Sequence, residues 1–142
     1  MTVRTERTVV LPASREAVWE FISDPSNRAG AISVVTDFEI TGAKTATWHL
    51  ALPIPVIDRT VAVETEETVT RPPEYVEFEG HSRVMHVVGE HQLEAVDGET
   101  RLTSRFVVDG RLPGVERYFR KHMDEEFDNL EAAVAADLGV VL

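Results

Sequence analysis

The chain has 142 residues and no cysteine, and its 25 acidic residues outnumber its 14 basic ones, which gives a formal net charge of −11 at pH 7. This length predicts one domain, and a hydrophobic share of 43% excludes a disordered chain. The acidic balance argues against binding to nucleic acid, whose phosphates attract basic surfaces. The lack of cysteine excludes disulfides, thiolate catalysis and cysteine-based metal centres.

Charge and apolar patterning also predict a location and an environment. The N-terminal segment has no continuous apolar run of the kind that a signal peptide carries. The longest uncharged stretch, between Lys44 and Asp58, is too short to span a membrane. We therefore expect a cytoplasmic protein. Only Lys44 and Lys121 among the basic residues are lysine, which together with the acidity suggests a protein kept soluble in high salt by its surface carboxylates.

The first part of the chain predicts a strand followed by a short helix. Residues Val3–Leu11 alternate between apolar and polar side chains, which is typical of a half-buried strand. Pro12 then breaks the strand, Ser14 is a suitable helix cap, and apolar residues at helical spacing predict a helix that ends at Asp24-Pro25. The segment 26–35 has a weak pattern, and from it we expect one loose helical turn or a lid.

From Phe38 onward the sequence predicts one strand after another. The expected segments are Phe38–Ile40, Ala46–Leu52, Val56–Val69, Tyr75–His81, Met85–Ala95 and Thr100–Asp109, with a hairpin turn at Asp97-Gly98. In the longest of these strands, the inner face is expected to carry Ile57, Arg59, Val61, Val63, Thr65, Glu67 and Val69. The large side chains expected on the inner faces of the strands are Trp48, Phe78, Met85 and Phe106.

After Pro113-Gly114 the apolar period changes to that of a helix. The apolar stripe of this helix consists of Val115, Phe119, Met123, Phe127, Leu130 and Val134. A strand, a helix, a run of antiparallel strands and a long closing helix together predict an α+β fold in which one sheet curls around the last helix.

Catalytic and metal-binding motifs are not found in the sequence. It contains no phosphate-binding loop, no nucleophile elbow and no zinc-binding helix motif. Strand parity places His49 and His86 on the outer face and His91 on the inner face, and this spacing predicts no convergence of metal ligands. His122 and Glu126 are four residues apart on the last helix, where a solvated or paired edge is the simpler interpretation. We expect no metal and no cofactor.

Some polar residues are nevertheless expected to face inward. His91 and Ser104 lie on neighbouring strands, where they form a satisfied core pair, line a wet cavity or act as a catalytic pair. Arg59 either pairs with Glu67 or holds an anionic or carbonyl group of a ligand, because a buried charge needs a partner. Alternatively, a bulge or the strand end returns these charged groups to solvent. Arg59 and His91 are the candidate catalytic residues.

Two segments resemble a known family. Residues 9–25, VVLPASREAVWEFISDP, resemble the opening of the START-like superfamily, also called SRPBCC, in which an apolar strand precedes the pattern P/A-S-x-E-x-V-W-x-F-x-x-D-P. Residues 93–102, LEAVDGETRL, are similar to the penultimate turn of that superfamily, L-x-P/A-x-D-G-x-T-x-L. The superfamily includes the birch pollen allergen fold. Size and short loops look like its polyketide cyclase/dehydrase branch and like the branch named after a small component of carbon monoxide dehydrogenase, although the tail or membrane anchor of some members of the second branch is not seen here.

The resemblance implies a single START-like domain, residues 1–142, with a helix-grip fold. In this fold a curved seven-stranded antiparallel sheet wraps around a long C-terminal helix, short helices follow the first strand, and a deep hydrophobic cavity lies between sheet and helix. The residues expected to line the cavity are Trp48, Leu50, Arg59, Val61, Phe78, Met85, His91, Ser104, Phe106, Phe119, Met123 and Phe127.

Three functions fit these observations. The first is a binding protein for a small hydrophobic molecule, such as a lipid, an isoprenoid or quinone, or an aromatic polyketide. The second is a cyclase or dehydratase that uses the same cavity, in which Arg59 or His91 polarises a carbonyl or moves a proton. The third is a protein–protein adaptor that docks through its acidic strands or the segment 26–35, and it predicts a filled cavity. The sequence predicts no oligomeric state.

Overall fold

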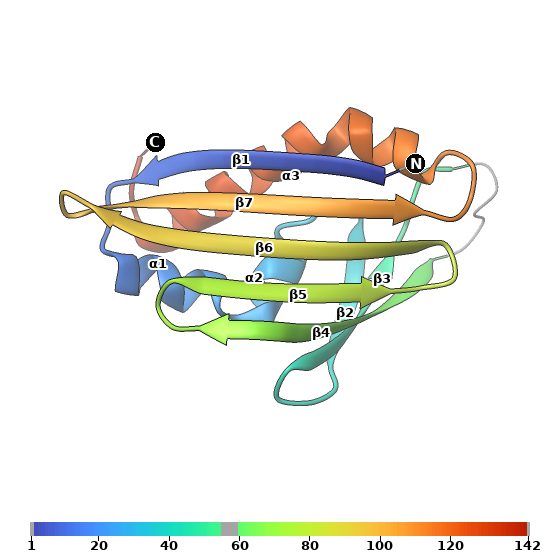
Figure 1. Cartoon of the computed structure of the whole chain (residues 1–142), viewed down its shortest axis with the longest axis horizontal. Helices are drawn as coiled ribbons and strands as arrows, with labels where there is room; N and C mark the ends of the chain where they lie inside the picture. Colours follow the sequence, from blue (N-terminus) through green and yellow to red (C-terminus); the bar gives the residue numbers. More distant parts are fainter. Residues whose placement is uncertain (1, 55–59, 142) are drawn as a thin grey trace.

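The computed structural model describes residues 2–54 and 60–141, which form one antiparallel sheet and three helices (Figure 1). The strands are β1 (Thr2–Leu11), β2 (Val35–Ile40), β3 (Thr45–Leu50), β4 (Val61–Arg71), β5 (Tyr75–His81), β6 (Met85–Val96) and β7 (Glu99–Gly110). The helices are α1 (Arg15–Ile22), α2 (Pro25–Gly30) and α3 (Val115–Leu138). The spatial order of the strands is β1-β7-β6-β5-β4-β3-β2, so the sheet is open and β1 and β2 are its edges.

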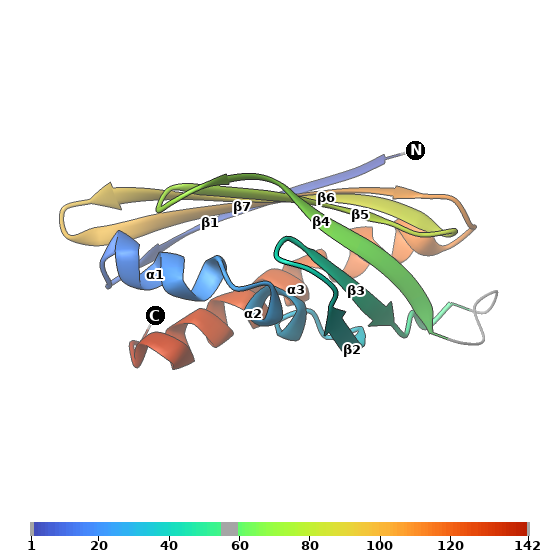
Figure 2. The ribbon, with the colours of Figure 1, turned by 90° about the horizontal axis from the view of Figure 1, so that it is seen from below.

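The sheet curves around the long C-terminal helix. Figure 2 shows the three helices on one side of the long strands, with β4 bending so that β3 and β2 continue around α3. The predicted α+β helix-grip, with seven antiparallel strands and short helices after the first strand, is confirmed.

Local sequence signals explain where the short helices begin. The Ser14 hydroxyl accepts a hydrogen bond of 3.2 Å from the backbone N–H of Ala17 and caps α1. The Asp24 carboxylate accepts one of 2.8 Å from the N–H of Ser26, and Pro25 occupies the first turn of α2. The beginning of the segment 26–35, expected to be one loose turn or a lid, is therefore a capped helix.

The core has two parts. The larger cluster lies between α3 and the sheet, and the smaller one joins α1 to the C-terminal half of α3. All the large side chains predicted on the inner faces and on the helix stripe are buried: Trp48, Phe78, Met85, Phe106, Val115, Phe119, Met123, Phe127, Leu130 and Val134.

Two details of the strands differ from the prediction. The register of β4 against β5 shifts between Glu67 and Val69, so that Val69 lies opposite Glu77 and on the outer face. The prediction that Val69 faces inward is wrong, because a bulge of one residue reverses the alternation beyond it. Leu52 is buried as expected, but it follows the end of β3. The predicted strand residues 56–59 lie outside the described part of the chain.

Candidate functional site

An apolar cavity lies between the inner face of the sheet, α3 and the segment that follows α2. It is lined by Arg28, Ala31, Ile32, Trp48, Leu50, Val63, Phe78, Met85, Val87, His91, Phe106, Val108, Phe119, Met123, Glu126 and Leu130. The space open to the centres of water-sized molecules is about 50 Å³. This is more than the roughly 10 to 15 Å³ that one water needs, and far less than a lipid or polycyclic molecule occupies. A ligand of that size enters only when side chains of the lining move.

The structure brings most of the predicted lining residues together at this cavity. Those at the cavity are Trp48, Leu50, Phe78, Met85, His91, Phe106, Phe119 and Met123. Three others lie beside it: Val61 is partly buried against the main core, Ser104 is hydrogen-bonded to His91, and Phe127 packs against Phe106. Arg59 lies outside the described residues, so its role stays a prediction.

Phe78 is at the centre of the aromatic lining. Its ring centroid is 5.6 Å from that of Trp48 and 6.2 Å from that of Phe106. The strand beneath the ring carries Gly89, directly opposite Phe78 in the ladder. A Cβ atom at Gly89 would be 2.4 Å from Cζ of Phe78, so only glycine leaves room for the ring in this position. Position 89 thereby sets where the ring lies in the cavity.

His91 is a neutral hydrogen-bonding group in the cavity wall. Its Nδ1 is 2.8 Å from the hydroxyl of Ser104, which faces it from β7, as strand parity predicted. Burial, reinforced by the positive charge of Arg28, lowers the pKa of His91 from its ordinary value to about 3. The imidazole is therefore uncharged at neutral pH and offers the cavity hydrogen bonding without a formal charge.

Arg28 is the buried cation of the site, and the sequence did not single it out. Its side chain is 4% exposed. Nη2 donates to Oε1 of Glu67 over 2.6 Å, and Nη1 donates to the carbonyl oxygen of Ile22 at the end of α1 over 2.8 Å. The guanidinium carbon lies 5.3 Å from the ring centroid of Phe78, within range of a cation–π contact. Glu67, expected to pair with Arg59, thus pairs with Arg28.

Glu126 is the anion of the cavity lining and belongs to α3. Its carboxylate accepts two hydrogen bonds from Ser33, one from the backbone N–H over 2.8 Å and one from the hydroxyl. The interaction closes the segment after α2 over the cavity, where Ala31 and Ile32 contribute to the lining. His122, four residues before Glu126, instead lies 3.6 Å from Glu125.

The sequence carried a signal for one of these two charged residues. Glu126 follows Met123 by three residues and precedes Leu130 by four, so its helical position falls on the apolar stripe that faces the sheet. Arg28 carried no such signal, because α2 is too short and polar to show an apolar face. Its burial depends on Glu67, which is distant in the sequence.

Two buried hydrogen-bond donors at the cavity have no acceptor among the described residues. They are Nε of Arg28 and the indole Nε1 of Trp48, and both residues line the cavity. A buried donor without a partner costs free energy, and such exceptions call for an explanation. An oxygen atom of a bound molecule would supply the missing acceptor.

The family of the chain follows from a comparison with known sequence families. The profile described as polyketide cyclase / dehydrase and lipid transport matches residues 2–135. The chain belongs to this family. Comparison of this polyketide cyclase / dehydrase and lipid transport family member with curated proteins gives no significant match.

Solved structures show the same fold at low sequence identity. A conserved protein from Geobacillus kaustophilus is 18% identical over 96% of this chain and 95% of its own, with a TM-score of 0.75. A START superfamily protein from Mycobacterium smegmatis is 13% identical over 94% of each chain, with a TM-score of 0.73. The Zhui aromatase/cyclase from Streptomyces sp. R1128 is 19% identical over 96% of this chain and 87% of its own, with a TM-score of 0.62. The likeness to the START superfamily that the sequence suggested is confirmed.

Among the described residues of this family member, no helix is both long and apolar enough to cross a membrane.

Proposed function

We propose that this protein binds a small hydrophobic molecule in the cavity between α3 and the sheet. The observation that carries the proposal is the composition of the lining, in which apolar side chains surround a few isolated polar groups. Cavities of this kind hold apolar ligands and orient them through the few polar contacts. The family description, which includes lipid transport, supports the same class of ligand.

The polar groups favour a ligand that carries oxygen acceptors. The Arg28 Nε and Trp48 Nε1 donors need acceptors, and the neutral His91 adds a third polar contact. A quinone or an aromatic polyketide offers carbonyl and phenol oxygens on an apolar ring system. A saturated lipid chain offers none along its length. Of the classes predicted from the sequence, oxygenated aromatic and quinone ligands therefore fit the cavity better than lipids.

Binding requires the cavity to widen. Met85 and Met123 lie in its lining, and unbranched thioether side chains change shape at low cost. The Ser33–Glu126 interaction holds the segment after α2 against α3 and is the contact that must yield if the ligand enters there.

The test is binding of defined probes to the full chain. A naphthoquinone, a hydroxylated anthraquinone and a saturated fatty acid are titrated separately by calorimetry, and native mass spectrometry gives the stoichiometry. We expect one oxygenated ring ligand per chain. Trp48→Phe keeps the aromatic ring but loses the N–H, and should weaken binding of the oxygenated ligand about tenfold. Trp19→Phe is the matched control, because Trp19 packs against the second core cluster. Absence of binding by all three probes would refute the proposal.

A second candidate function is catalysis of ring closure or dehydration in the same cavity. It is supported by the family description and by the structural likeness to an aromatase/cyclase. With a pKa of about 3, His91 is a poor proton acceptor at neutral pH, where efficient general bases have a pKa near the working pH. In such an enzyme His91 and Arg28 would orient and polarise a carbonyl group. His91→Gln would then preserve ligand binding and abolish turnover, whereas in a carrier the variant has no turnover to lose.

A further inference from the structure

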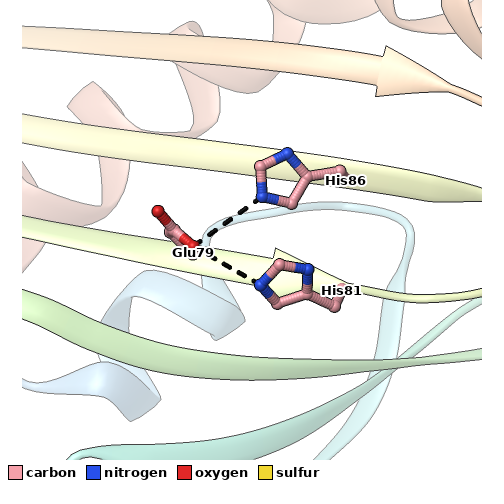
Figure 3. Close-up of side chains that lie close together, drawn as sticks. All are labelled: Glu79, His81 and His86. Atoms are coloured by element: carbon pink, nitrogen blue, oxygen red, sulfur yellow. Dashed lines mark ion pairs between the residues drawn. The ribbon is translucent and has the colours of Figure 1, made fainter.

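The outer face of the sheet carries a second cluster of side chains, on the side opposite the cavity. Glu79 and His81 of β5 and His86 of β6 point toward one another at one end of the β5–β6 hairpin (Figure 3). Oε2 of Glu79 is 3.4 Å from Nε2 of His81 and 3.8 Å from Nε2 of His86. The two imidazole rings have centroids 4.6 Å apart. We name these three residues the His81–His86 cluster.

The hairpin fixes this arrangement. His81 and His86 are partners in the register of β5 and β6, so their side chains leave the same face side by side. Glu79 precedes His81 by two residues and shares that face. The turn between them is held by Ser82, whose hydroxyl accepts hydrogen bonds from the N–H groups of Val84 and Met85 over 3.1 and 3.0 Å.

We propose that the His81–His86 cluster binds a divalent first-row transition metal ion such as Zn²⁺. Two imidazole nitrogens and one carboxylate oxygen are ligands that zinc, nickel and copper accept, and together they occupy one side of the ion. The candidate ligand atoms all lie within 4.8 Å of one another. Two ligand atoms each about 2.1 Å from a tetrahedral zinc ion lie about 3.4 Å apart. The two distances from Glu79 are therefore close to the required geometry.

Exposure allows the remaining adjustment. The side chains of His81, Glu79 and His86 are 60%, 37% and 30% exposed, so each can rotate without disturbing the core. The same exposure leaves the remaining coordination positions open to water.

The neighbouring charges favour a cation at this place. In the sheet register Glu66 lies directly opposite Glu79, Glu64 opposite His81, and Asp109 opposite His86. Like charges opposite each other, as in the Glu66–Glu79 pair, destabilise a sheet. A bound dication offsets this repulsion in a chain whose net charge is −11. An exposed ion pair of histidine and glutamate, by contrast, contributes little free energy by itself.

The test is a titration of the full chain with zinc chloride by calorimetry, followed by the absorption spectrum with Co²⁺. Millimolar Mg²⁺ in the buffer suppresses binding to carboxylates alone. We expect one zinc ion per chain. His81→Ala and His86→Ala should each weaken binding at least about tenfold, because loss of even an outer partner of a ligand costs 10- to 100-fold. The bands of bound Co²⁺ should disappear in the same two variants.

The matched control is His122→Ala. His122 also lies near a carboxylate, 3.6 Å from Glu125, and is 30% exposed like His86, but it has no second histidine beside it in the described structure. Zinc affinity should be unchanged in this variant. The proposal is overturned if the native chain binds no zinc under these conditions, or if His122→Ala weakens binding as much as His81→Ala and His86→Ala. Circular dichroism of each variant confirms that a lost signal reflects a lost ligand and not unfolding.

Discussion

Ser33 donates two hydrogen bonds to Glu126, one from its backbone and one from its side chain, and so joins the segment after α2 to the long helix. Ser33→Ala removes the hydroxyl donor and leaves part of a buried carboxylate unsatisfied. We expect the free energy of unfolding to fall by about 1.5 to 3 kcal/mol, the usual contribution of a hydrogen bond to a charged group. Urea denaturation measures this loss. Ser26→Ala is the control, because Ser26 contributes only its backbone N–H to the α2 cap. Equal stability of Ser33→Ala and the native protein would contradict the prediction.

The buried pair of Arg28 and Glu67 should be costly to break from one side. Glu67→Leu leaves the guanidinium of Arg28 buried without its anion, and we expect a loss of about 3 kcal/mol of unfolding free energy. The double variant Arg28→Met/Glu67→Leu removes both charges and should recover at least half of that loss. The exposed pair of Arg101 and Glu94, at 3.3 Å, is the control and should contribute less than about 1 kcal/mol. Additive effects of the two buried substitutions would show that the pair is not coupled.

His91 should make the stability of the protein depend on pH. Its pKa is about 3 in the folded protein and near 6.5 when unfolded, so between these values the unfolded chain binds a proton that the folded chain does not. Stability is therefore fully present above pH 6.5 and falls as the pH decreases toward 3, by about 2 kcal/mol at pH 5. His91→Gln lacks this contribution.

The measurement is the difference in unfolding free energy between the native protein and His91→Gln at pH 7.5 and at pH 5. That difference should shrink by about 2 kcal/mol on acidification. His49→Gln, a substitution on the outer face, serves as the control for the general effect of losing a histidine. Parallel pH dependences of native protein and His91→Gln would contradict the low pKa.

Gly89→Ala should disturb the cavity through Phe78. The added Cβ would overlap the ring, which is confined between Trp48 and Phe106, so the ring must move into the cavity or the strands must separate. We expect a loss of about 1 to 3 kcal/mol, as for other overpacked cores, together with weaker ligand binding. Gly30→Ala is the matched control, since a Cβ there meets nothing within 4 Å. Unchanged stability and binding of Gly89→Ala would mean that the ring position is not constrained.

Alternation along the chain predicted the inner face well, because each strand between Ala46 and Val108 exposes every second residue to the same core. It failed beyond Glu67, where the bulge reverses the parity and puts Val69 outside. A bulge depends on how two strands pair, and the sequence of one strand does not reveal it. For the same reason, parity placed His86 on the outer face but did not show that His81 would lie beside it.

The charged part of the site was harder to predict than the apolar part. The stripe on α3 identified Phe119 and Met123, since apolar residues at helical spacing indicate one buried face. Arg28 is buried because of three separate partners, Ile22, Glu67 and Phe78, that come together only in the folded chain. Such a residue looks like an ordinary surface arginine in the sequence.

The open sheet also has a consequence for how copies of this protein meet. A sheet with free edges offers unpaired backbone groups to a second chain, and such strands are common starting points of aggregation. At the β2 edge, Asp37 and Glu39 are exposed, so two molecules that meet edge to edge there bring like charges together. The acidic residues of this strand thereby protect the monomer from strand addition, a protection that weakens as the carboxylates are protonated in acid.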